Sequence, residues 1–338
     1  MAGEIRYIPV WQAHNPHIRA DAMALWARLK VLPAQADPVA RADEICMAAY
    51  DGNRLVGVET CRVRFLAALD ARFAFTNVLV DPDYRQCGIS SALLLHSYYL
   101  LAGWAQAHPE ERLAGTGFVL VNPKLGRRPV VGDGFFLIGF SHEGHQLRIT
   151  WFENYRLHDR DLALSSGSGH ALRWEWAWRR NASGPVADAM ALWTKLGMRP
   201  RGVETRDRTA EISLVGYDGE RPVAVSTVKP VFHPGLGEIF AGLSLVVDPA
   251  YAHADVRHRM AKENFSRLEQ WSAADPGKPW AGLMTVYEDP EMGAFPVDPS
   301  GLVLAGYAKS GGQIRLNWFA HAQVEPGRAV EKPFLLSG

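Results

Sequence analysis

The chain contains few cysteines and no excess of charge of either sign. Its three cysteines, Cys46, Cys61 and Cys87, are too few and too scattered for a disulfide framework or for a spaced metal site. Lys plus Arg and Asp plus Glu both number 36, so the formal net charge is zero. Without a basic bias, nothing points to nucleic acid or to an anionic membrane surface as a partner.

Long apolar runs are missing as well. No apolar stretch reaches the length of a membrane span, and the N-terminus MAGEIRYIPV lacks the charged and apolar regions of a signal peptide. We therefore expect a soluble, cytoplasmic protein that makes no membrane contact. A length of 338 residues exceeds one typical core and predicts two domains.

The strongest signal in the sequence is an internal repeat. The segment Asp21 to Trp26, DAMALW, recurs as Asp188 to Trp193, a shift of 167 residues (188 minus 21). The same shift relates Arg6 to Arg173, Trp11 to Trp178, Tyr50-Asp51-Gly52 to Tyr217-Asp218-Gly219, Val80-Asp81-Pro82 to Val247-Asp248-Pro249, Gln146 to Gln313, Arg148 to Arg315 and Trp151-Phe152 to Trp318-Phe319. One register kept over so many positions indicates a duplicated domain and argues against two unrelated ones.

The repeat predicts the boundaries of the two copies. We expect an N-terminal domain over 1–155, a linker over 156–170 that contains the flexible segment SSGSG, a C-terminal domain over 171–323 and a tail over 324–338. In the first copy we expect strands near 5–10, 44–49, 55–65, 73–80, 117–122, 135–140 and 146–153, and helices at 17–29 and from 89 onward. This order predicts an α/β (α+β) fold with two tandem domains, each a mixed, mostly antiparallel sheet flanked by helices.

One stretch of the first copy carries the features of a phosphate site. The strand residues Val78, Leu79 and Val80 are followed by the turn Asp81-Pro82-Asp83 and then by a helix that starts near Ile89. Free amide groups and the dipole at a helix N-terminus favour a bound anion, and glycine lets that anion approach the backbone. The candidate binding residues are Val78, Leu79, Val80, Arg85, Gln86, Cys87, Gly88, Ile89, Ser90 and Ser91.

These residues resemble the acyl-CoA motif of the Gcn5-related N-acetyltransferases (GNATs). The match consists of Val80-Asp81-Pro82, Arg85, Gly88 and Ser90, where Ser90 departs from the usual Gly or Ala. The resemblance implies acetyl-CoA as co-substrate, no metal, and a small-molecule acceptor with an amine or hydroxyl. It also extends to the tandem GNAT proteins of actinomycete antibiotic biosynthesis, including that of clavulanic acid. An alternative from another class is a catalytically silent acyl-CoA binder that acts as a sensor or scaffold.

The second copy departs from this motif. Where the first copy has the segment from Arg85 to Ser90, the second has Ala252, His253, Ala254, Asp255, Val256 and Arg257. Asp255 replaces the glycine and places a carboxylate where a pyrophosphate would lie, which like-charge repulsion opposes. We therefore expect a degenerate C-terminal domain and tight acetyl-CoA binding in the first copy only.

The catalytic groups are not evident from the sequence. Many GNATs carry a carboxylate on the fourth strand and a Tyr in a helix after the fifth, and neither is present here. The remaining candidates are Glu59, His96, Tyr98 and Tyr99, each of which can equally be a structural polar group. A nucleophilic role for Cys87 lacks a His partner.

Two further patterns favour structural roles. The segment His142-Glu143-Gly144-His145 lacks the HExxH spacing of a metal motif, and its counterpart is a plain hairpin loop. Trp174, Trp176 and Trp178 alternate with period two, which predicts a strand packed between the domains.

Overall fold

The computed structural model describes residues 4–122, 125–132, 134–157, 171–179, 183–198, 205–275, 277, 280–289, 292–325 and 330. The chain divides into two compact units, one within residues 1–153 and the other within residues 154–332. Most of the expected linker (156–170) and of the expected tail (324–338) lies outside the described residues, so these boundaries remain predictions. No described helix has the length and apolar character needed to cross a membrane.

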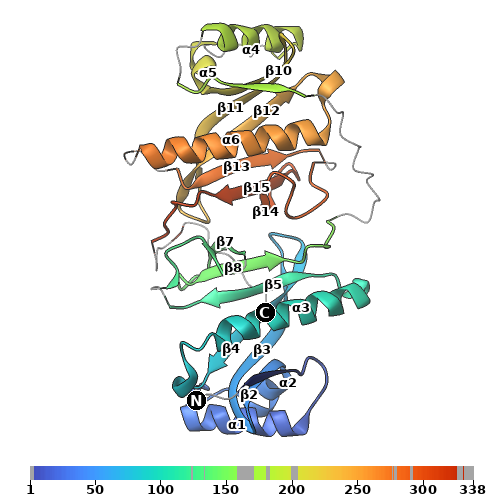
Figure 1. The fold of residues 1–338 in the computed structure, drawn as a ribbon, viewed down its shortest axis with the longest axis vertical. Helices are drawn as coiled ribbons and strands as arrows, with labels where there is room; N and C mark the ends of the chain where they lie inside the picture. Colours follow the sequence, from blue (N-terminus) through green and yellow to red (C-terminus); the bar gives the residue numbers. More distant parts are fainter. Residues whose placement is uncertain are drawn as a thin grey trace. The chain divides into compact units, whose positions relative to one another are not determined.

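The first unit is built on one mixed sheet of eight strands in the order β1-β2-β3-β4-β5-β8-β7-β6 (Figure 1). The strands are β1 (Ile5–Pro9), β2 (Ile45–Asp51), β3 (Arg54–Leu66), β4 (Ala71–Val80), β5 (Leu113–Leu120), β6 (Val130–Val131), β7 (Phe135–Phe140) and β8 (Gln146–Trp151). All neighbours are antiparallel except β4 and β5, which run parallel. The Asp51-Gly52 hairpin is present, with Gly52 at a φ of 58°.

Helices cover both faces of this sheet. α3 (Ile89–Ala107) lies across β1 to β5, and Gly57 permits its close approach, because a Cβ there would lie 3.1 Å from both Ile89 and Leu93. On the opposite face, α1 (Pro16–Leu29) contacts β3 and α2 (Pro38–Asp43). α1 starts where Asn15 accepts hydrogen bonds from the amides of residues 17 and 18, as the cap of a helix that begins with proline.

The second unit repeats this design. Its seven-stranded sheet has the order β14-β15-β13-β12-β11-β10-β9, with only β12 and β13 parallel. Its elements are β9 (Arg173–Trp176), α4 (Ser183–Lys195), α5 (Thr205–Glu211), β10 (Ile212–Asp218), β11 (Arg221–His233), β12 (Glu238–Val247), α6 (Ala254–Ala274), β13 (Gly282–Tyr287), β14 (Val303–Tyr307) and β15 (Gln313–Trp318). Two mixed sheets with flanking helices confirm the expected fold class.

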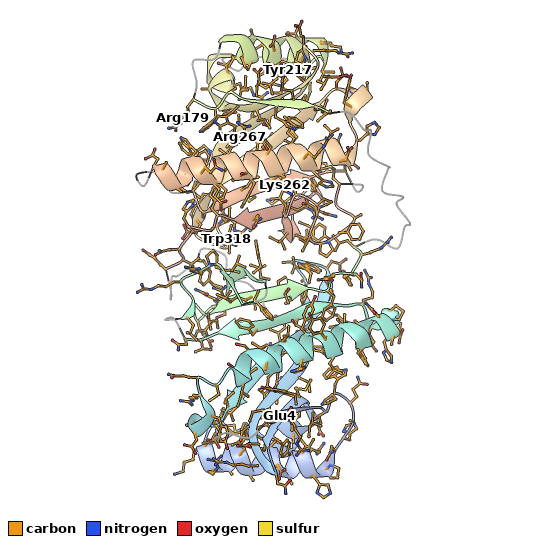
Figure 2. The ribbon with its side chains drawn as sticks, in the orientation of Figure 1. Glu4, Arg179, Tyr217, Lys262, Arg267 and Trp318 are labelled. Atoms are coloured by element: carbon orange, nitrogen blue, oxygen red, sulfur yellow. The ribbon has the colours of Figure 1, made fainter. Side chains whose placement is uncertain are left out.

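The residues that the repeat preserves form matching scaffold contacts. The Tyr50 hydroxyl donates to Asp21 at 2.7 Å, and the Tyr217 hydroxyl donates to Asp188 at 2.9 Å (Tyr217 is labelled in Figure 2). The buried carboxylate of Asp81 pairs with Arg28 and Arg54, as Asp248 does with Lys195 and Arg221. These side chains hold the first helix of each copy on its sheet.

Buried arginines hold the loop after the fifth strand in both copies. Arg148 is fully buried and donates to the carbonyls of Gly126, Arg128 and Pro129 and to the side chain of Gln146. Burial lowers the pKa of Arg148 to about 10, so the side chain is charged at neutral pH. Arg315 makes the equivalent contacts in the second copy.

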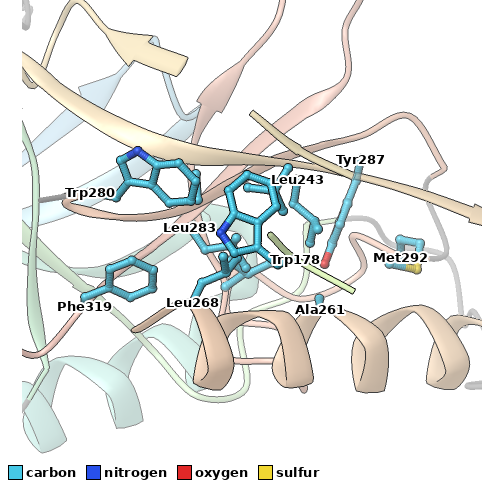
Figure 3. Close-up of a cluster of buried hydrophobic side chains, with 12 residues drawn as sticks. Trp178, Leu243, Ala261, Leu268, Trp280, Leu283, Tyr287, Met292 and Phe319 are labelled. Atoms are coloured by element: carbon cyan, nitrogen blue, oxygen red, sulfur yellow. The ribbon is translucent and has the colours of Figure 1, made fainter. Parts of the chain in front are cut away.

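The core of the second unit is rich in tryptophan. Trp178 lies 5.7 Å from Trp280 and 5.9 Å from Trp271 between ring centroids, above α6 (Figure 3). Trp174 and Trp176 lie on β9, where Trp176 packs against this cluster and both pack against a second cluster of the same unit. The period-two pattern thus marks a strand, and its tryptophans fill the second unit's own core, where the sequence had predicted packing between domains.

One strand and one helix of the first unit differ from expectation. β5 begins at Leu113 and ends at Leu120, whereas the sequence predicted 117–122. Gly115 and Gly117 interrupt the apolar pattern by which a strand is recognised in a sequence. In the structure these glycines let β5 approach Phe73 and Phe75 on β4. The short helix α2 was not expected. It is set by local capping, since the Asp37 side chain accepts from the amide of Val39 and Pro38 opens the helix.

Candidate functional site

The parallel strands β4 and β5 separate along their length. They pair only from Arg72 to Phe75 on β4, against Leu113 to Gly117 on β5. Beyond this point β4 stays paired with β3 and β5 stays paired with β8, so each strand is held by its other neighbour while the two diverge. The result is a gap in the middle of the sheet, between Thr76–Val80 and Phe118–Leu120.

Strand register determines which backbone groups face this gap. The amide of Asp81 donates to Val56 on β3, and alternate residues of an antiparallel strand point their backbone groups the same way. Asn77 and Leu79 therefore belong to the β3 ladder, while the N–H groups of Thr76, Val78 and Val80 point into the gap. Of the three candidate binding residues on this strand, Val78 and Val80 therefore direct their N–H groups into the gap, whereas Leu79 does not.

The gap opens into a cavity of about 850 Å³. Thr76, Asn77 and Val78 line it from β4, Phe118 to Val121 line it from β5 and the following residue, and Leu94 lines it from α3. The other residues that line the cavity are Arg41, Arg62, Arg64, Phe75, Leu125, Val131, Ser141 and Glu143. A cavity of this size accommodates a small organic ligand.

The segment from Arg85 to Ser91 forms an exposed, uncapped helix start at the end of β4. Gln86 and Gly88 both have left-handed φ values, 68° and 74°, and Gly88 caps α3 without any side-chain hydrogen bond. Consecutive amides around left-handed residues form a concave nest for an anion, and the helix dipole adds to it. A Cβ on Gly88 would meet no atom within 4 Å, so the concave face is open.

The second copy has lost this arrangement. Its strands β12 and β13 also separate, pairing only at Ala241 and Gly242, and a smaller cavity of about 490 Å³ lies there. However, α6 begins at Ala254, two positions earlier than α3 in the repeat, and no residue from 252 to 257 has a left-handed φ. Arg257 forms an ion pair of 2.6 Å with Asp289, beyond the end of β13, at the place that Ser90 occupies in the first copy.

A buried acid lies beneath the gap in the first unit. Glu59 is fully buried on β3, opposite Val78, and accepts a hydrogen bond of 2.8 Å from Ser97 on α3. Burial raises the pKa of Glu59 to about 7, against the opposing effect of the Ser97 and Thr76 hydroxyls. Thr76 lies near enough to act on this pKa, although its hydroxyl is outside hydrogen-bond geometry.

This acid is specific to the first copy. The shift of 167 residues relates Glu59 to Ser226 and Ser97 to Asn264, and in the second unit these two form a neutral network with Ser213. A core position that accepts a neutral serine in one copy does not need a carboxylate for folding. Because a buried ionisable group costs stability, its presence favours a functional role in the first copy.

The other candidates from the sequence lie away from the cavity. His96 is exposed on α3, with its ring centroid 4.7 Å from that of Tyr7, and the Tyr98 hydroxyl donates to the carbonyl of Trp151 at 3.2 Å. Tyr99 is exposed, and Cys87 is exposed within the helix start. Among the described residues, no group of three His, Cys, Asp or Glu side chains is arranged to hold a metal ion.

The structure therefore brings together only part of the expected set. Val78 lines the cavity and Val80 faces the gap, whereas Arg85 to Ser91 form a separate helix start. Leu94, about one turn further along α3, lines the cavity. The candidate residues from the sequence did not include Thr76, Asn77 or the three arginines. Alternation along β3 and β4 was the signal that could have found the β4 residues and two of the arginines.

Comparison with known proteins gives a broad likeness to acetyltransferases. No protein-family model and no curated sequence matches the chain. A GNAT-family acetyltransferase from Streptococcus pneumoniae is 13% identical over 44% of this chain and 99% of its own, with a TM-score of 0.29. The ribosomal-protein-S18-alanine N-acetyltransferase from Escherichia coli is 16% identical over 44% of this chain and 94% of its own, with a TM-score of 0.28.

A third structure spans more of the chain. The GCN5-related N-acetyltransferase from Kribbella flavida is 15% identical over 74% of this chain and 59% of its own, with a TM-score of 0.27. This chain thus spans less than two thirds of that protein. Identities and TM-scores at this level carry no inference about activity.

Proposed function

We propose that the protein is an acyltransferase whose first unit binds acetyl-CoA and transfers the acetyl group to an amine or hydroxyl of a small molecule. One observation carries the proposal. The first copy combines an open, left-handed, uncapped helix start with a cavity between diverging strands, and the second copy keeps the diverging strands but not the helix start. The sequence resemblance of the same segment to the GNAT motif supports this assignment.

The residues of the first unit fit an acyl-CoA. The amides from Gln86 to Ser91 would hold its pyrophosphate, with Arg85 adding positive charge and Gly88 leaving room for close approach. The apolar side chains of Val78, Leu94 and Phe118 would border its pantetheine arm. Bound there, acetyl-CoA would supply an activated acetyl thioester to the gap.

The backbone of β4 would then serve as a donor. The N–H groups of Val78 and Val80 point into the gap, and both are fixed in direction because β3 holds the other edge of the strand. Preorganised N–H donors stabilise negative charge that develops on a carbonyl oxygen, and removal of one such donor typically costs about 3 kcal/mol in known enzymes. This part of the site requires no side chain.

Glu59 is the group that we assign to proton uptake from the acceptor. An acid whose pKa is about 7 exchanges a proton readily at neutral pH, and Thr76, whose hydroxyl lies near enough to act on this pKa, lines the cavity. The hydroxyl would pass the proton, since it can donate and accept at once.

A silent acyl-CoA binder is the second candidate. Full burial of Glu59 and the absence of His96, Tyr98 and Tyr99 from the cavity wall favour it, because none of these four candidate acids and bases lines the cavity. Under this candidate the first unit binds acetyl-CoA without releasing a thiol in the presence of amines. A place in antibiotic biosynthesis is the finer form of the enzymatic proposal and rests on sequence resemblance alone.

The variant Gly88→Asp tests the proposed site by copying Asp255 of the second copy. Placing a carboxylate about 4 Å from a phosphate costs about 1 to 4 kcal/mol, depending on the local dielectric. We expect the acetyl-CoA dissociation constant, measured by calorimetry, to rise by a factor between about five and several hundred. Thiol release in the presence of an amine panel should fall with it.

Gly52→Asp is the matched control. Gly52 has a φ of 58° and also meets no atom within 4 Å of an added Cβ, so the substitution imposes a similar backbone strain in the β2–β3 hairpin, outside residues 85–91. Equal losses of affinity in both variants would assign the effect to folding. Unchanged affinity in Gly88→Asp would contradict the proposed site.

A further inference from the structure

We infer that the acceptor carries an anionic group, a carboxylate or a phosphate, which Arg64 binds on the face of the gap opposite α3. This inference rests on the proposed function, because it names the class of molecule that the same cavity would take as its second substrate. It depends on three observations that the acyl-CoA assignment does not use.

The first observation is the face on which the arginines lie. Directly paired residues of neighbouring strands point to the same side of a sheet. Glu59 and its partner Val78 point toward α3, as the Ser97 contact shows. Arg62 and Arg64 are offset by an odd number of residues from Glu59, so they point to the other face, where α2 contributes Arg41.

The cavity therefore reaches both sides of the sheet. Leu94 of α3 lines one side, close to the helix start that we assign to acetyl-CoA, and the three arginines line the other. A thioester held from the α3 side leaves the arginine side for the acceptor. The two substrates would meet in the gap, beside the backbone of Val78.

The second observation is an excess of positive charge on the arginine side. Glu44 accepts from both Arg41 and Arg62, so one carboxylate serves two guanidinium groups. Glu143, which also lines the cavity, lies 3.1 Å from Nδ1 of His145, so three guanidinium groups stand against the two carboxylates of Glu44 and Glu143. Across the described ranges, no ion-pair or hydrogen-bond partner is found for the partly buried guanidinium of Arg64, which lines the cavity.

The third observation comes from the duplication. Arg41, Glu44 and Arg62 correspond to Arg208, Glu211 and Lys229, so both copies carry the same sign of charge at these three positions. Arg64 corresponds to Val231, which lines the smaller cavity of the second unit. An arginine is therefore not needed at this position for folding.

The chemistry of a guanidinium identifies the ligand class. Arginine binds a carboxylate or a phosphate through parallel N–H donors, and this pairing is directional. With its anionic group at Arg64, a small amine or alcohol could place its nucleophile in the gap. Amino acids and phosphorylated small amines have this layout, whereas simple monoamines do not.

The experiment uses matched pairs of acceptors that differ only in the anionic group. The carboxylate arm compares phenylalanine with phenethylamine and β-alanine with ethylamine, and the phosphate arm compares phosphoethanolamine with ethanolamine. Thiol release from acetyl-CoA gives the kcat/KM of each compound. We expect the anionic member of at least one pair to be the better substrate, and the arm in which this occurs identifies the group.

The variant Arg64→Val copies the second copy at this position. A hydrogen-bonded ion pair at a partly buried site contributes roughly 10- to 100-fold in affinity. We therefore expect the KM for the preferred anionic acceptor to rise by about that factor, while the KM for acetyl-CoA stays unchanged. Arg72→Val is the control, because Arg72 lies on the same sheet, pairs with Glu111 and does not line the cavity.

A second readout does not depend on acetyl transfer. Phenylglyoxal modifies accessible arginines. The intact protein is treated with it in the presence and absence of each compound, without acetyl-CoA, and peptide mass spectrometry after digestion then gives the extent of modification of Arg64. Protection by the anionic members only supports the inference even if acetyl-CoA fails to bind, so the two proposals fail separately. Equal kcat/KM within every pair, or no anion-dependent protection of Arg64, would overturn it.

Discussion

Replacement of Glu59 by glutamine should remove a pH dependence of stability from the first unit. The carboxyl of Glu59 is fully buried, and its pKa rises from 4.5 to about 7 in the folded protein, chiefly because of burial. A raised carboxyl pKa means that the folded state keeps a proton that the unfolded state has released. The contribution of Glu59 to the stability of the first unit is therefore most favourable below about pH 4.5 and falls as the pH rises toward 7.

The size of the effect follows from the same values. A carboxyl that ionises near 4.5 when unfolded and near 7 when folded lowers the free energy of unfolding by about 3 kcal/mol over that range. Glutamine keeps an acceptor for Ser97 but cannot ionise. The stability of Glu59→Gln relative to the wild type should therefore increase by about 3 kcal/mol between about pH 4.5 and pH 8.

Two measurements test this prediction. Carbon-13 NMR of labelled glutamate side chains should show one carboxyl that titrates near pH 7 and disappears in Glu59→Gln. Urea unfolding followed by hydrogen exchange of peptides from β3 gives the stability of the first unit at each pH. Glu220→Gln, at an exposed position of the second unit, is the control and should show no such change. A stability difference between Glu59→Gln and wild type that is independent of pH would refute the reasoning.

Three further outcomes follow from the packing. Arg148→Met should destabilise the first unit by about 3 to 5 kcal/mol in thermal or urea unfolding, because the buried guanidinium donates to the carbonyls of Gly126, Arg128 and Pro129, and a loss below about 1 kcal/mol would contradict this role. Gly57→Val should displace α3 and weaken acetyl-CoA binding, since its Cβ would press on Ile89 and Leu93, and unchanged affinity would argue against the coupling. Arg257→Ala should break the ion pair with Asp289 yet create no second acetyl-CoA site by calorimetry, because the open helix start is missing; tight binding in the second unit would contradict this.

The duplication explains why so much of the fold could be predicted. Each copy serves as a check on the other, since Asp51-Gly52 and Asp218-Gly219 correspond in the repeat and both stand in hairpin turns with left-handed glycines, at φ values of 58° and 59°. These features depend on local residue chemistry. The start of β5 was not predicted because Gly115 and Gly117 are chosen for strand packing, which periodicity does not report.

The parts of the site that consist of consecutive residues could be predicted from the sequence, and the parts that depend on contacts between distant residues could not. The helix start around Gly88 stands in consecutive residues, and its left-handed φ agrees with the choice of glycine. The gap depends on where two strands distant in sequence stop pairing, which no local pattern determines. The role of Arg64 requires both the β3 register and its comparison with Val231, and the burial that raises the pKa of Glu59 exists only in the folded core.

The central claim is that one helix start, in the first copy alone, binds acetyl-CoA through its main-chain amides. Hydrogen exchange with and without saturating acetyl-CoA tests it most directly, read in peptides that cover residues 85–93 and 252–260 of the intact chain. The account predicts slower exchange over 85–93 and no change over 252–260. Exchange that is unaltered over 85–93, or slowed only over 252–260, would contradict it.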